Sequence, residues 1–225
     1  HQPLSFSVSE TTEGVHIHII DAELMGKGEK EKKDLYIEGV QNNGIINHYE
    51  YIINSEGTIE IRHVLKPEGK MPLWFPRIGL TLTVSDALDQ VKWYGRGPQE
   101  NYPDRKTGYP TGIYASTVQA MYEPYLMPQD YGLRTDVRWL QLTTDKGIGL
   151  QFKMNEWFNF NIYPYSTDNL TKAMYTYQLQ KQKGMTLNLD YATTGVGCTA
   201  RGVFGAYKAM PQEYRRTISI KPMMK

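Results

Sequence analysis

The chain has little cysteine, no excess of either charge and no long apolar run. Cys198 is its one cysteine, which excludes an internal disulfide framework and any metal site built from several thiolates. Lys and Arg number 25 against 24 Asp and Glu, a net charge of +1, so we expect neither nucleic acid nor an anionic membrane as partner. No membrane-length segment or signal peptide is visible. The chain starts at His1 rather than methionine, so we expect a segment of a longer protein.

Short runs of alternating polar and apolar residues dominate the sequence. A period of two is typical of half-buried strands, and glycines at 57, 147 and 184 suit the hairpin connections between them. We therefore predict an all-β antiparallel fold, in a single domain over residues 1–225. The runs cover residues 15–20, 58–65, 79–84, 136–142, 147–152, 158–163, 186–191 and 217–222.

Two segments depart from this pattern. A short helix is predicted after Ser166, Thr167 or Asp168, any of which can cap it, with Leu170 and Ala173 facing inward. Between residues 102 and 131, prolines and aromatics replace the alternation. We expect this stretch to lack regular structure and to meet another surface.

Glu100 and Asp104 lie four residues apart, which raises the possibility of a glycosidase acid pair. Such a pair needs carboxyls about 5–5.5 Å apart for retention or roughly 6.5–9.5 Å for inversion. Pro98 and Pro103 disfavour the helix that would align them. Neighbouring guanidinium groups would lower the pKa of the carboxyls, whereas a general acid needs a raised pKa. A charge-paired structural loop is the favoured interpretation.

His16 and His18 share one face of a predicted strand, a spacing that metal sites use. Glu60, Asp21 or His63 could complete a ligand set in three dimensions. A solvent-facing surface opposite the apolar residues of the same strand is favoured over a metal site. Farther along, the glycines of residues 193–202 indicate either a close backbone approach or a plain loop.

The string WYGRGPQENYPDR resembles the C-terminal sandwich domain of bacterial glycoside hydrolase family 2 β-galactosidases, which carry a W-x-G-x-G-P-x-E-N-Y-x-D-R run. Residues 122–142, 158–170, 187–197 and 207–222 also resemble segments of that family. We expect the motif to be structural. Its fixed positions are Trp93, Gly95, Gly97, Pro98, Glu100, Asn101, Tyr102, Asp104 and Arg105.

The resemblance implies a large antiparallel super-sandwich of galactose mutarotase-like type, packed against a catalytic barrel of the same polypeptide. The parent would hydrolyse terminal β-D-galactosides with retention, as a homo-oligomer in the bacterial cytoplasm or periplasm. Its catalytic glutamates would lie in the barrel, so no catalytic residue, metal or cofactor is expected on this chain. Any Mg²⁺ or Na⁺ that the whole enzyme needs would bind outside it.

The sequence departs from the family in two places. Some relatives carry a sugar-stacking tryptophan after the glycine turn, where this chain has Arg201, a weak substitute for substrate binding. An acidic segment that usually precedes the first strands is missing, so we expect a sandwich truncated at its N-terminal side. An exposed strand edge and self-association would follow, and a monodisperse monomer at high concentration would argue against them.

Two other functions stay open on the sequence. A carbohydrate-binding module would need exposed aromatic platforms, for which Trp157, Tyr163 and Tyr165 are candidates. A mutarotase-like epimerase would need a histidine acid and a carboxylate base in one pocket. Sugar titration and an anomerisation assay on the isolated chain distinguish them.

Overall fold

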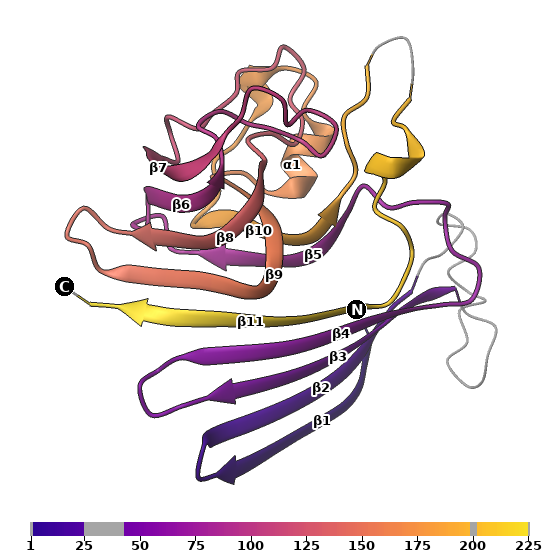
Figure 1. Ribbon diagram of the computed structural model, residues 1–225, viewed down its shortest axis with the longest axis vertical. Helices are drawn as coiled ribbons and strands as arrows, with labels where there is room; N and C mark the ends of the chain where they lie inside the picture. Colours follow the sequence, from indigo (N-terminus) through magenta and orange to yellow (C-terminus); the bar gives the residue numbers. More distant parts are fainter. Residues whose placement is uncertain (1, 25–42, 199–201, 225) are drawn as a thin grey trace. The chain divides into compact units, whose positions relative to one another are not determined.

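The computed structural model describes residues 2–24, 43–198 and 202–224 (Figure 1). Contacts group the chain into two compact units, His1–Phe75 with Met210–Lys221 and Pro76–Ala209 with Pro222–Lys225. Each unit is built on antiparallel strands, which confirms the predicted all-β class. The single domain over 1–225 stays a prediction. None of the helices among the described residues has the length and apolar character to cross a bilayer.

The first unit holds five strands side by side in the order β1-β2-β3-β4-β11 (Figure 1). The turn between the third and fourth is closed by Asn54, whose Oδ1 accepts from the N–H groups of Glu56 and Thr58, both at 3.0 Å. Gly57 supplies the positive φ of 76° that this turn requires. The strands are β1 (Gln2–Thr11), β2 (Gly14–Leu24), β3 (Gly44–Ile53), β4 (Ile59–Glu68) and β11 (Tyr214–Met223).

Burial in this unit is uneven across the strands. Ile61 of β4 and Ile218 of β11 are buried and lie opposite each other in the register. Every residue of β1 is exposed, with Phe6 at 67%. The apolar face expected on β2 is partly buried, since Val15 is exposed while Ile17 and Ile19 are half-buried. Alternation therefore predicted this strand correctly, whereas the degree of burial depends on what covers the sheet.

The second unit holds six strands in the order β5-β10-β9-β8-β6-β7. The long strand β9 pairs with both β8 and β10, and so occupies the middle of this sheet. The strands are β5 (Arg77–Val84), β6 (Gln90–Arg96), β7 (Thr111–Thr117), β8 (Arg134–Thr143), β9 (Gly149–Tyr163) and β10 (Met185–Thr193).

Three local predictions need correction. The runs at 147–152 and 158–163 belong to one continuous strand, β9. The stretch 102–131 is not wholly irregular, because it contains β7, which pairs with β6 over seven residues. The first residues of the resemblance string lie in β6 rather than in a loop. Backbone pairing to a neighbouring strand overrides the irregular composition in these segments.

The short helix is confirmed. α1 (Thr167–Lys172) has Ser166 as N-cap, whose hydroxyl oxygen accepts from the N–H of Asn169 at 3.0 Å. Leu170 and Ala173 are each 3% exposed, as predicted. Leu170 packs with Tyr131 and Tyr163, which anchors the helix to the second unit.

Candidate functional site

The motif loop, residues 97–105, leaves the end of β6 and folds against the start of β8. Its anchor is Asn101, which is fully buried. The Asn101 N–H donates to the Leu133 carbonyl at 2.8 Å, and its Oδ1 accepts from the N–H and the hydroxyl of Thr135 at 3.1 and 2.5 Å. Arg134 Nε also donates to the Pro98 carbonyl at 3.1 Å. The loop is therefore fixed along its length.

Glu100 lies at the centre of this loop, with 5% of its surface exposed. Its carboxylate accepts from Arg105 Nη2 at 2.8 Å, the Gly132 N–H at 2.9 Å and the Tyr102 hydroxyl at 3.2 Å. The Tyr125 hydroxyl is a fourth donor. Burial raises the pKa of Glu100, but these hydrogen bonds outweigh it and hold the pKa below its ordinary value. An ionised carboxylate with four donors is unsuited to act as a general acid.

Asp104 does not join this network, so the charge pairing expected of the loop holds for Glu100 but not for Asp104. Its two carboxylate oxygens accept from the backbone N–H groups of Val196 and Gly197, at 3.0 and 2.7 Å. The two carboxylates of the motif therefore serve different segments. Asp104 holds the loop that contains Gly195 and Gly197, called the glycine loop below, and Glu100 holds the backbone just before β8.

The contact between Asp104 and the glycine loop explains one glycine. A Cβ on residue 195 would lie 2.3 Å from Asp104 Cγ and 2.5 Å from both carboxylate oxygens. Glycine at position 195 is therefore required for the close approach that the sequence suggested. Arg201, the weak substrate-binding candidate, lies outside the described residues.

The remaining motif positions supply packing. Trp93 is fully buried, packs edge-on against Phe160 with ring centroids 5.9 Å apart, and donates from Nε1 to the Arg96 carbonyl at 2.9 Å. A Cβ at Gly97 would lie 2.9–3.1 Å from the rings of Tyr114 and Trp93. These aromatic contacts hold the motif loop on the sheet.

A second polar network, on β5, β9 and β10, was not predicted from the sequence. Arg77 binds Asp190 bidentately, at 3.1 Å from Nε and 2.7 Å from Nη2, and donates from Nη1 to Asp130 at 3.2 Å. Asn161 accepts from Arg77 and donates to Asp130 at 2.9 Å. Although burial lowers the pKa of Arg77, Asp190 and Asp130 outweigh it and raise the pKa above its ordinary value. Burial raises the pKa of Asp190 above its ordinary value, and the Arg77 guanidinium opposes that shift by favouring the ionised carboxylate. This network forms because strands that are far apart in the sequence pair in the fold, so the sequence spacing of its residues does not indicate it.

A hollow of about 260 Å³ lies beside this network, over α1. Asp130 and Tyr163 form its polar wall, and the Tyr163 hydroxyl donates to Asp130 at 3.1 Å. The described residues of its lining include no histidine, so the hollow does not supply the histidine and carboxylate that a mutarotase-like epimerase would need. The lining residues are Pro128, Gln129, Asp130, Tyr163, Thr167, Leu170 and Thr171.

The three aromatic residues suggested for a carbohydrate-binding module differ in exposure, and Tyr165 is half-buried. Tyr163 is fully buried, so it offers no face to a sugar. Trp157 is 59% exposed, but the Arg138 guanidinium lies 4.1 Å from its ring centroid and covers one face. The same guanidinium lies 5.0 Å from the ring of Tyr94, so the three side chains stack.

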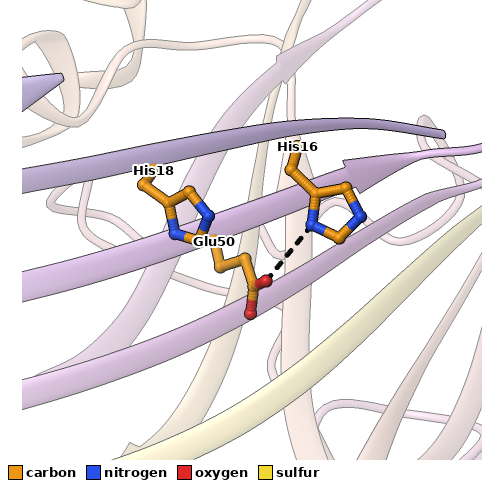
Figure 2. Close-up of side chains that lie close together, drawn as sticks. All are labelled: His16, His18 and Glu50. Carbon is orange, nitrogen blue, oxygen red and sulfur yellow. Dashed lines mark hydrogen bonds and ion pairs between the residues drawn. The ribbon is translucent and has the colours of Figure 1, made fainter. Parts of the chain in front are cut away.

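The two histidines singled out in the sequence meet a partner that was not predicted. Figure 2 shows the Glu50 carboxylate between the rings of His16 and His18, with His16 Nδ1 3.4 Å from Oε1. The three suggested partners are engaged elsewhere. Glu60 binds Arg62 at 2.8 Å, while Asp21 accepts from Asn47 at 2.8 Å and His63 lies 3.0 Å from Asn47. Burial lowers the pKa of His63 to about 4.

The known proteins that the chain is similar to agree with the family that the motif resembles. A family model described as Beta galactosidase small chain matches residues 7–220. The chain is 38% identical to the β-galactosidase of Priestia megaterium over 147 residues and 39% identical to that of Vibrio cholerae over 122 residues. These matches cover 65% and 54% of this chain, but 14% and 11% of those relatives.

Among solved structures, the GalM/aldose epimerase homologue from C. elegans is similar to the chain, with 12% identity and a TM-score of 0.46. That match covers 97% of this chain and 68% of the epimerase homologue. The family match extends over most of the chain, including β2 to β10 and the whole motif loop. The chain belongs to the β-galactosidase small chain family.

Proposed function

We propose that the chain is an accessory domain of a β-galactosidase, which supports a catalytic barrel of the same polypeptide and contributes to subunit assembly. The match of residues 7–220 to the small chain family carries this proposal. The chain spans about one seventh of the length of the first relatives it matches. Most of such an enzyme would therefore lie outside this segment.

The chemistry of the motif supports a structural role. Both of its carboxylates are occupied, Glu100 by four donors and Asp104 by two backbone N–H groups. Neither is left free to protonate a glycosidic oxygen. The catalytic glutamates would then lie in the barrel, where the parent hydrolyses terminal, non-reducing β-D-galactosides with retention. Any Mg²⁺ or Na⁺ needed for that reaction would bind there too.

An exposed aromatic stack is our candidate for the surface that meets the rest of the polypeptide. Tyr94, Arg138 and Trp157 lie together on the second unit, with Trp157 59% exposed. Tyrosine, tryptophan and arginine are the residues most enriched at protein interfaces. The catalytic barrel of the same polypeptide is the partner that we expect to cover this surface.

A chain-replacement experiment tests the proposed function. The Priestia megaterium β-galactosidase would be truncated to remove the segment that matches this chain, and this chain would be supplied in its place as a fusion. We expect the truncated enzyme to lose hydrolysis of a chromogenic galactoside and the fusion to recover it. The same fusion carrying Trp157→Ala tests the aromatic stack.

Three results would count against the proposal. Full activity of the truncated enzyme without any replacement would show that this segment is dispensable. Binding of galactose or lactose by the isolated chain would favour the alternative of a carbohydrate-binding module. Anomerisation by the isolated chain would favour an epimerase.

A further inference from the structure

The cluster of His16, His18 and Glu50 joins two neighbouring strands. His16 and His18 are two residues apart on β2, so their side chains leave the same face of the sheet. Glu50 of β3 lies directly opposite His18 in the strand register. The imidazole rings are stacked, with centroids 6.4 Å apart and planes inclined by 27°. Strand pairing therefore brings two nitrogen ligands and one oxygen ligand together.

The spacing of the three groups suits a tetrahedral metal ion. Zn–N and Zn–O bonds of about 2.1 Å place neighbouring ligand atoms about 3.4 Å apart in a tetrahedron. His16 Nδ1 and Glu50 Oε1 are separated by 3.4 Å, which matches that edge. One ligand atom from each of the three residues lies within 4.8 Å of the others. His18 is exposed, so its ring has room to turn and shorten the longer distances.

Charged neighbours orient the carboxylate and leave one oxygen available. Arg62 Nη1 binds Glu50 Oε2 at 3.1 Å, while Oε1 faces His16. Arg62 is itself paired through Nε with Glu60 at 2.8 Å, which offsets its positive charge. Hydrogen bonds from neighbouring groups commonly fix a ligating carboxylate in this way. On the other side, Ser7 and Ser9 of β1 lie opposite the two histidines and carry no charge.

We propose that His16, His18 and Glu50 form a binding site for a divalent transition metal ion, with Zn²⁺ as the ion that the ligands suit best. Two imidazoles and one carboxylate favour Zn²⁺ over Mg²⁺ or Ca²⁺, which prefer oxygen ligands alone. Three protein ligands leave a fourth position for water. The ion would link β2 to β3 beside the exposed strand β1, and binding to the folded chain would raise its stability.

Calorimetric titration of ZnCl₂ tests the site directly. The titrated chain should lack an affinity tag and carry Cys198→Ser and His1→Gln, so that neither the exposed thiol nor the terminal histidine competes. We expect one Zn²⁺ per chain at about pH 7.5 and an affinity at least about tenfold weaker at pH 5.5, because protons compete for imidazole nitrogen. MgCl₂ should give no comparable binding.

Matched variants identify the ligands. His18→Gln and Glu50→Gln should each weaken Zn²⁺ binding by about tenfold or more. His48→Gln and Glu10→Gln are the controls, because His48 lies on the same face of the sheet, Glu10 lies on the neighbouring strand β1, and neither belongs to the cluster. Each control should leave the affinity within about threefold. Circular dichroism would verify that every variant is folded.

Three results would overturn the proposal. The first is no Zn²⁺ binding by the folded chain up to about 1 mM. The second is equal loss of affinity in the controls and in the ligand variants. The third is full binding by the His16→Gln, His18→Gln double variant, which would place the metal elsewhere.

Discussion

Gly195→Ala tests how the motif loop holds the glycine loop. The new Cβ would lie 2.3 Å from Asp104 Cγ, whereas ordinary carbon contacts begin at 3.4 Å. The new Cβ would also lie 2.5 Å from both oxygens of the same carboxyl group. The whole carboxyl group must therefore move by about 1 Å. Such a shift breaks the hydrogen bonds from Val196 and Gly197, which are 3.0 and 2.7 Å long.

The expected cost follows from those two bonds. A hydrogen bond to an ionised group contributes about 1.5–3 kcal/mol to stability. Hydrogen bonds to water replace part of this free energy, because Val196 is 52% exposed. We therefore expect Gly195→Ala to lower the free energy of unfolding by about 2–4 kcal/mol. Urea denaturation followed by tryptophan fluorescence would measure it.

Two companion variants make the measurement specific. Gly205→Ala is the control, because a Cβ there would have no atom within 4 Å. It should change the free energy of unfolding by less than about 0.5 kcal/mol. In an Asp104→Ala background the clash is absent, so Gly195→Ala should cost less than about 1 kcal/mol. Equal losses for Gly195→Ala and Gly205→Ala, or an unchanged loss without Asp104, would refute the reasoning.

Two further predictions concern the buried charges. Because hydrogen bonding lowers the pKa of Glu100 from 4.5, its stabilising contribution is complete above pH 4.5 and is lost as the pH falls through the folded pKa. Glu100→Gln should lower the free energy of unfolding by about 2–4 kcal/mol at neutral pH and make it fall less steeply as the pH drops below 4.5, as measured by urea titrations at several pH values. An unchanged pH dependence in the variant would contradict this. Arg77→Met leaves Asp190, 2% exposed, without its guanidinium and should cost about 3–5 kcal/mol by the same assay. Arg62→Met, at a 51% exposed guanidinium, should cost about 0–1 kcal/mol, and similar losses for the two would contradict our assignment.

Local chemistry made several parts of the fold predictable. Ser166 caps α1, and Leu170 faces inward, because capping and helical spacing depend on neighbours in the sequence. Alternation likewise located β4, β5 and β10. It did not locate β7, whose pairing with β6 decides its structure. Nor did it locate β1, every residue of which is exposed.

The candidate sites were less predictable than the strands. Glu50 meets His16 and His18 only through the register of β2 and β3, and β3 was not expected from the sequence. Arg77 and Asp190 are 113 residues apart and meet through the pairing of β5 with β10. Glu100 and Asp104, although four residues apart, bind different segments of the chain. Contacts between segments that are far apart in the sequence decide all three arrangements, and sequence spacing does not encode them.

Hydrolysis of a chromogenic β-galactoside by the purified, folded chain is the most direct test of the account. The chain would be assayed alone, with and without Mg²⁺ and Zn²⁺, beside the fusion to the truncated Priestia megaterium enzyme. We expect no turnover by the isolated chain under any of these conditions, and turnover by the fusion. Hydrolysis by the isolated chain that is lost on Glu100→Gln, in a variant that stays folded, would contradict the account.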